Sequence, residues 1–142
     1  MWQQSGTSRL RDDRAVSAVE FSVVVPILLL AIFLTIQAGF WMYGRNTALH
    51  AAREGVSYLR LAGTNEDPLA FQPEAEELAY DYATQLGGLD DVQVSSELDE
   101  ETGRVSVTVS GTMDAPAGQW TVTQQVTGTL EQFRPDVGYD GD

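Results

Sequence analysis

One carboxylate at the entrance of a long apolar run is the residue whose chemistry most needs explaining. The run from Phe21 to Tyr43 carries no charge, and Glu20 immediately precedes it. The residues alone leave two interpretations open. Glu20 rests at the level of lipid headgroups, favoured by the helix dipole, or it enters the apolar layer and needs a cation there. If a peptidase cuts between Ala15 and Val16, the new α-amino group of Val16 in a neighbouring copy supplies that cation, with an ordinary pKa of roughly 7.7–8.0.

The other polar groups predict no catalytic residue, no metal site and no cofactor. His50 is the only histidine, has no nucleophile pattern near it and is expected on a helix surface. The acidic stretch at 97–101 lacks the alternating acids and the mid-loop glycine of a calcium loop. We therefore interpret it as a solvated turn and predict that the protein is not an enzyme.

The distribution of charge separates the beginning of the chain from the rest. The 142 residues carry a formal charge of −13, and all the acids except Asp12, Asp13 and Glu20 follow Tyr43. An acidic domain repels phosphate backbones, which argues against nucleic-acid binding. The chain has no cysteine, so disulfides and thiol chemistry are excluded.

The apolar run is long enough for a membrane-crossing helix, which needs roughly 20 mainly apolar residues. We predict a leader at 1–15 without structure in 1–14, a transmembrane helix at 16–44 that contains Pro26, and its extramembrane continuation at 45–63. Trp41 and Tyr43 are expected in an aromatic belt. One helical face continues beyond the membrane and ends near Gly63; it comprises Ala48, Leu49, Ala52, Val56 and Leu59.

A small acidic α/β head is predicted at 64–133, followed by a disordered tail at 134–142. Its helix should run from Pro73 to Leu86, with a buried stripe formed by Ala75, Leu78, Ala79, Tyr82 and Leu86. Three runs of period-two alternation, separated by turns at 99–103 and 114–118, predict a three-stranded antiparallel meander with one packed face. Trp120 is expected in the core. The predicted fold class is therefore α+β.

The stretch from Arg14 to Phe21, followed by the apolar run with Pro26, resembles the class III signal of type IV pilins and pseudopilins. It is most similar to the TadE-like pseudopilins of tight-adherence pilus systems, whose typical signature resembles Ala52, Arg53, Glu54 and Gly55. Ala15 stands where such signals usually have glycine. The resemblance covers about residues 11–60.

The resemblance implies a minor pilin or pseudopilin that is cut between Ala15 and Val16. Helices would pack through an apolar surface, with Glu20 paired to a neighbour's amine; the packing residues are expected to include Phe21, Val24, Pro26, Ile27 and Leu30. The implied partners are other pilin subunits, a prepilin peptidase, the assembly platform of the inner membrane and the lipid bilayer. The N-terminus is expected in the cytoplasm and the head outside it, with incorporation into an extracellular pilus as one destination.

Two alternatives use the same apolar run differently. An uncleaved single-span anchor could carry an extracytoplasmic interaction or sensor domain. A secreted protein could be cut near Ala38, although the run is longer than the roughly 7–15 residues of a signal-peptide core. The N-terminus of the mature protein distinguishes all three.

Overall fold

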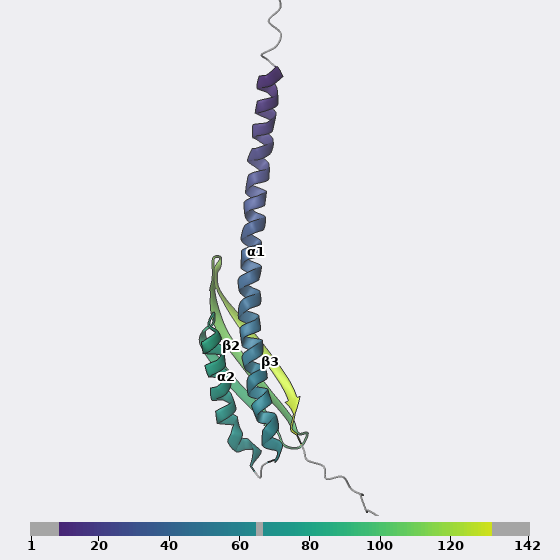
Figure 1. The fold of residues 1–142 in the computed structure, drawn as a ribbon, viewed down its shortest axis with the longest axis vertical. Helices are drawn as coiled ribbons and strands as arrows, with labels where there is room; N and C mark the ends of the chain where they lie inside the picture. The colour runs from purple at the N-terminus through teal and green to yellow at the C-terminus, as the bar shows by residue number, and fades with distance from the viewer. Residues whose placement is uncertain (1–8, 65–66, 132–142) are drawn as a thin grey trace, which may run out of the picture. The chain divides into compact units, whose positions relative to one another are not determined.

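The computed structural model describes residues 9–64 and 67–131, with side chains at 19–63 and 67–131. Two α-helices, two short 3-10 helices and three strands follow in the order α1, η1, η2, α2, β1, β2, β3 (Figure 1). The predicted α+β class, with a long N-terminal helix and a three-stranded antiparallel sheet, is confirmed. The chain divides into two compact units, Met1–Ala38 and Gly39–Asp142.

Helix α1 extends over Arg9–Leu61 and includes Pro26. The expectation that residues 9–14 lack structure was wrong. Arg, Leu and Ala are good helix formers, and neither Gly nor Pro interrupts the chain between Arg9 and Val16. Residues 1–8 of the expected leader and the expected tail at 134–142 lie outside the described residues.

Gly63 lies just beyond the end of α1, in the 3-10 helix η1 (Ala62–Thr64). The helix was expected to end near Gly63, and α1 ends at Leu61; Gly63 is not among the described residues with positive φ. A Cβ at Gly63 would come within 2.7 Å of the Glu131 carbonyl oxygen and 2.9 Å of Leu130 Cβ. The position therefore requires a residue without a side chain because the end of the sheet lies against it.

Helix α2 extends over Gln72–Leu86, after the 3-10 helix η2 (Pro68–Phe71). The predicted helix was thus correct to within one residue. Its predicted buried stripe was partly wrong, because α2 buries Ala75, Ala79 and Ala83, whereas Leu78, Tyr82 and Leu86 are exposed. Small side chains face the core because they let the helix backbone approach α1 closely.

Gly55 of α1 shows how close this approach is. A Cβ at Gly55 would lie 3.2 Å from the Ala75 carbonyl oxygen, from Ala79 Cβ and from Val107 Cγ1. Helix α1, helix α2 and the sheet therefore meet at one position, and a larger residue there would force them apart.

The three strands form a single antiparallel meander in the order β1-β2-β3, as predicted. Strands β1 (Asp90–Asp99), β2 (Arg104–Ala115) and β3 (Gly118–Thr129) are joined by short turns. The β2–β3 register is unbroken from Arg104↔Thr129 to Ala115↔Gly118. The β1–β2 register shifts between Asp90 and Gln93. Strand β3 ends at Thr129, within the head predicted at 64–133.

The core lies between the two helices and one face of the sheet. The predicted face of α1 is confirmed for Ala48, Ala52, Val56 and Leu59, which are all buried; Leu49 is only partly buried. Strand β2 contributes Val105, Val107, Val109 and Met113. Trp120 is not in the core, because 45% of its surface is exposed. Its strand β3 is an edge strand of the sheet.

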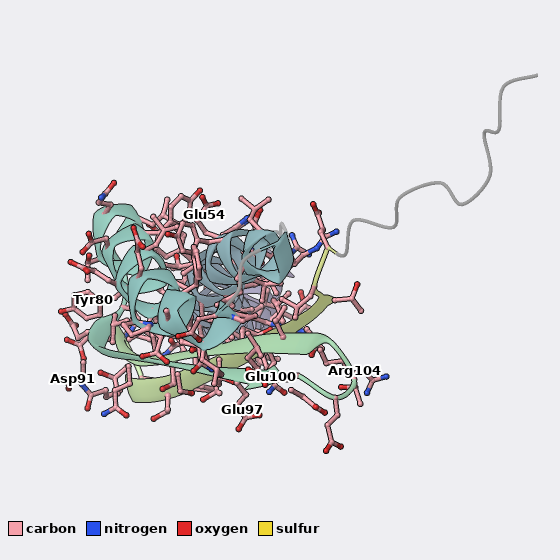
Figure 2. The ribbon with its side chains drawn as sticks, turned by 90° about the horizontal axis from the view of Figure 1, so that it is seen from below. Glu54, Tyr80, Asp91, Glu97, Glu100 and Arg104 are labelled. Carbon is pink, nitrogen blue, oxygen red and sulfur yellow. The ribbon has the colours of Figure 1, made fainter. Side chains whose placement is uncertain are left out.

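The opposite face of the sheet is polar, and no helix of the described residues covers it. In Figure 2 the helices lie on one side of the sheet, and Glu97 points away from them. Alternation along β2 places its serines and threonines on this face, since its valines are buried on the other. The prediction of one packed face and one solvated face is therefore confirmed.

Candidate functional site: the apolar helix

The apolar part of α1 exposes large hydrophobic side chains along its length. It is the only helix among the described residues that is long and apolar enough to cross a membrane, by length and composition. Phe21 is 70% exposed and Ile27 is 61% exposed. The other predicted packing residues, Val24, Pro26 and Leu30, are exposed as well. In water this surface would be unfavourable, so it needs lipid or other helices around it.

Glu20 lies near the beginning of this apolar surface and is exposed. Ala15 and Val16, the residues of the predicted cut, lie within helix α1, and their side chains lie outside the described residues. In one helix, Val16 and Glu20 are a single turn apart on the same face. The charge pairing that we expect between them involves two copies, so the isolated chain does not test it.

The signature segment of α1 divides between the core and the surface. Ala52 and Gly55 are buried, whereas Arg53 and Glu54 are exposed. The small residue at 55 permits the contact between α1, α2 and β2, and Ala52 is a buried member of the hydrophobic core. Packing in the head thus accounts for the two small residues of the signature. The two charged residues have no structural requirement of this kind and stay available to a partner.

Tyr43 has a structural role that the sequence did not reveal. Its hydroxyl donates a hydrogen bond of 2.8 Å to the carbonyl oxygen of Leu86, at the end of α2. Its ring lies where a Cβ of Gly88 would be, and Gly88 has a φ of +81°. The space occupied by the Tyr43 ring and the positive φ therefore both require glycine at position 88. Tyr43 therefore joins α1 to the end of α2 in addition to the predicted interfacial position.

Trp41 and Arg45 form a second pair at this level of α1. The Arg45 guanidinium carbon lies 5.4 Å from the centroid of the Trp41 ring, within the range of a cation–π interaction. Arg45 is the first charged residue after Glu20. An aromatic ring stacked with a cation suits the boundary between an apolar layer and water.

Gln37 is a polar residue of the apolar run that sequence reasoning missed. Only 9% of its surface is exposed, and neither amide atom has a hydrogen-bond partner among the described residues. A buried amide without a partner costs roughly 1–3 kcal/mol. The signal that could have found Gln37 is its rarity, since Ser22 and Thr35 are the other polar side chains between Phe21 and Tyr43.

The acidic turn after β1 is organised by Asp99. One Asp99 carboxylate oxygen accepts hydrogen bonds from the backbone N–H groups of Glu101 and Thr102, and the other accepts one from the Thr102 hydroxyl. The hydrogen bond from the Thr102 side chain is the largest cause that holds the pKa of Asp99 below its ordinary value of 3.8. The interpretation of the stretch at 97–101 as a turn is confirmed only from Glu100 onward, because β1 extends to Asp99.

A shallow hollow of about 220 Å³ lies on the open face of the sheet beside this turn. Its lining residues are Glu97, Asp99, Arg104, Val105, Ser106, Gln125 and Thr127. Within the described part of the chain, no three histidine or acidic side chains are grouped as a metal would require. His50 is exposed on α1, as expected.

The arrangement therefore assigns the distinctive chemistry of the chain to the apolar helix rather than to a pocket in the head. Residues 15–57 match the family model of TadE-like protein. This TadE-like segment includes the predicted cut, Glu20, the apolar run and the signature, and it ends within α1. The resemblance to TadE-like pilin-type proteins is thereby supported for this segment. No curated protein and no solved structure matches the chain.

Proposed function

We propose that the protein is a minor pilin or pseudopilin of a tight-adherence type IV pilus. It is cut between Ala15 and Val16 by a prepilin peptidase and then assembles through α1. Its role is structural rather than enzymatic, and its partners are pilin subunits, the assembly platform and the lipid bilayer. The head lies outside the cytoplasm, and the N-terminus lies inside.

The exposed apolar surface of α1 within the TadE-like segment is the observation that carries this proposal. Phe21, Val24, Ile27 and Leu30 are all more than half exposed in the isolated chain. Lipid covers such side chains in the membrane, and neighbouring helices can cover them in a fibre. A subunit can therefore move between the two environments without exposing this surface to water.

Glu20 supplies the polarity that aligns one subunit with the next. An ionised carboxylate in an apolar layer requires a nearby cation, and the free amine of a neighbour's Val16 provides one. The same pairing fixes the axial position of the two helices, because sliding them by one turn would leave both charges unpaired. Cleavage precedes assembly in this scheme because it creates the amine.

The substitution Glu20→Gln tests the proposal. It removes the charge while keeping the shape, so we expect normal insertion into the membrane and at least a tenfold loss of assembled subunits, measured by shearing and immunoblotting. Glu77→Gln is the matched control, because Glu77 is an exposed glutamate on α2. Normal assembly of the Glu20→Gln protein would contradict the charge pairing.

N-terminal sequencing of the mature protein from its host tests the cut separately. We expect Val16 as the first residue. A chain that begins at Met1 while it functions would favour the uncleaved membrane anchor, and a chain that begins near Gly39 would favour the secreted protein.

A further inference from the structure

The two edges of the sheet are protected very differently. Strand β1 is one edge and strand β3 is the other. An edge strand presents unpaired N–H and C=O groups to which another strand can add, and proteins block unwanted pairing with charges, bulges or covering elements.

Strand β1 has all three of these protections. Its register with β2 shifts between Asp90 and Gln93, and it carries four acidic residues. Helix α2 supplies the cover, because a Glu76 carboxylate oxygen accepts hydrogen bonds of 2.8 Å from the Ser96 N–H and 2.7 Å from the Ser96 hydroxyl. A further strand on the β1 edge would have to displace this carboxylate.

Among the described residues, strand β3 has none of these protections before its last residues, where Arg60 of α1 donates a hydrogen bond to the Thr129 carbonyl oxygen. The strand contains no charged residue and no proline, and its register with β2 is unbroken. The acids of the head gather elsewhere, since α2 and β1 carry four each. A second strand can therefore approach β3 without meeting a row of carboxylates.

The hydrogen bonding at the end of β3 identifies the backbone groups that point away from β2. The Leu130 N–H donates to the Gly103 carbonyl oxygen, so residue 130 faces the β2 side. Because inward and outward residues alternate in an antiparallel pair, the backbone groups of Thr121, Thr123, Gln125 and Thr127 point outward. Among these, the Thr123 carbonyl oxygen accepts a 2.6 Å hydrogen bond from the Gln124 side-chain amide. No other described residue accepts a hydrogen bond from these four N–H groups, and the same alternation explains why Arg60 reaches the Thr129 carbonyl oxygen.

We propose that the free edge of β3 binds an extended strand donated by a different polypeptide of the assembly apparatus. This inference rests on the proposed function only in placing the chain in a membrane with its assembly partners. The interaction is strand addition, in which backbone hydrogen bonds supply affinity and alternate side chains supply specificity.

A second copy of this chain fits the β3 edge poorly. Gly44 of α1 lies against Met113, near the start of β3, and Arg60 lies against its end. Antiparallel pairing of two β3 strands would therefore make the Gly44–Arg60 segments of the two α1 helices run in opposite directions, which does not suit two chains anchored in one membrane. Parallel pairing about an exact twofold axis would place each outward N–H group opposite the same N–H group of the second copy. Donors would then face donors, and the ladder of hydrogen bonds could not form. Pairing of β3 with β1 of another copy is opposed by the protections of β1.

The side chains of β3 define the chemistry of the incoming strand. On the helix side, Trp120 is 45% exposed and Val126 is only partly buried. On the open face of the sheet lie the side chains of the residues whose backbone groups point away from β2, and these are threonines and Gln125. The donated segment should thus alternate apolar and polar residues, and it should be neutral or basic because the head is acidic.

Site-specific photocrosslinking in the native host tests the proposal with the full chain. Two variants carry a photoreactive residue, one at Thr123 and the other at Thr127. Both should crosslink to the same segment of another protein, at partner residues about four apart, because both strands are extended. Ser95 is the matched control on the protected β1 edge and should give at least tenfold less product. Crosslinks to a second copy, to residues 132–142, to lipid, or to partner residues without this spacing would overturn the proposal.

A backbone substitution gives an independent readout. Gln125→Pro removes one outward N–H while leaving the ladder to β2 intact, so it should reduce the Thr123 crosslink at least tenfold. Gln125→Thr keeps the N–H and should leave the yield unchanged. Equal yields from the two variants would contradict strand addition, and if Gln125→Pro fails to fold, the spacing of the crosslinks remains decisive. Neither readout depends on whether the chain is cut at Val16, so failure here is distinguishable from failure of the proposed function.

Discussion

The two halves of α1 use opposite kinds of residue on their contact surfaces. Before Gly39 the helix presents large side chains such as Phe21 and Ile27, and these are exposed. From Gly44 onward it buries small ones such as Ala48, Ala51 and Gly55. One helix therefore serves two environments: large apolar residues suit lipid or other helices, and small residues let the head pack at short distance.

The difference follows from what each half must contact. Lipid adapts to any apolar surface, so the first half needs area rather than a particular shape. The second half meets the backbone of α2 and the side chains of β2, where a single added carbon at Gly55 would lie 3.2 Å from three atoms. The size and shape of the side chains are therefore restricted in the second half of α1 and not in the first.

Leu59→Ala should give the largest effect on the second half. Leu59 is completely buried in the core, so the substitution leaves a cavity and should lower the free energy of unfolding of the head by about 2–5 kcal/mol. Chemical denaturation of the full chain in detergent, followed by near-ultraviolet circular dichroism, measures this. A loss below about 1 kcal/mol would show that the core is looser than the structure indicates.

Tyr58 should give a smaller, pH-dependent effect. A hydrogen bond to Glu74 is the largest cause that raises the pKa of Tyr58 above its ordinary value of 10.0. Because the folded state holds this proton more tightly, its stabilisation is complete below the unfolded pKa and is lost as pH rises through the folded pKa. The melting temperature of the head should therefore fall less steeply above pH 10 in Tyr58→Phe than in the unsubstituted chain. If the melting temperatures of the two proteins fell equally steeply with pH, the contact between Tyr58 and Glu74 would not contribute to the stability of the head.

Ile27→Ala should give the smallest effect on the head and completes the comparison with Leu59→Ala. Ile27 is 61% exposed in the first half of α1, so its truncation leaves no cavity in the head. We expect the free energy of unfolding of the head to stay within about 0.5 kcal/mol, while the yield of assembled subunits falls. A loss of head stability comparable to that of Leu59→Ala would show that the two halves are not independent.

Periodic patterns predicted the elements of this fold well, but predicted contacts between elements less well. The α2 helix and the meander were recognised because their periods of 3.6 and 2 extend over many residues. The choice of Ala83 over Leu86 as a core residue of α2 was not predictable, because both lie on plausible apolar stripes. Trp120 was misplaced for a related reason, since alternation assigns its face but not its distance from the edge of the sheet.

The candidate site was predictable as far as it depends on one continuous segment. Glu20, the predicted cut between Ala15 and Val16, and the signature at Ala52–Gly55 are recognised from neighbouring residues in the sequence. Their charge pairing and processing stay predictions, since both involve other molecules. The contacts of Tyr43 with Leu86 and Gly88 were missed because they join positions far apart in the chain.

The sequence by itself determined the apolar helix, the acidic head and the alternation of the strands, because each depends on residue types within a short stretch. Only the tertiary structure decided which side of each element is covered. It placed α2 and Glu76 beside β1, whereas among the described residues only Arg60 reaches the outer edge of β3, at Thr129. The physical reason is that backbone hydrogen-bonding groups are the same in every residue, so their availability depends on which elements lie beside them.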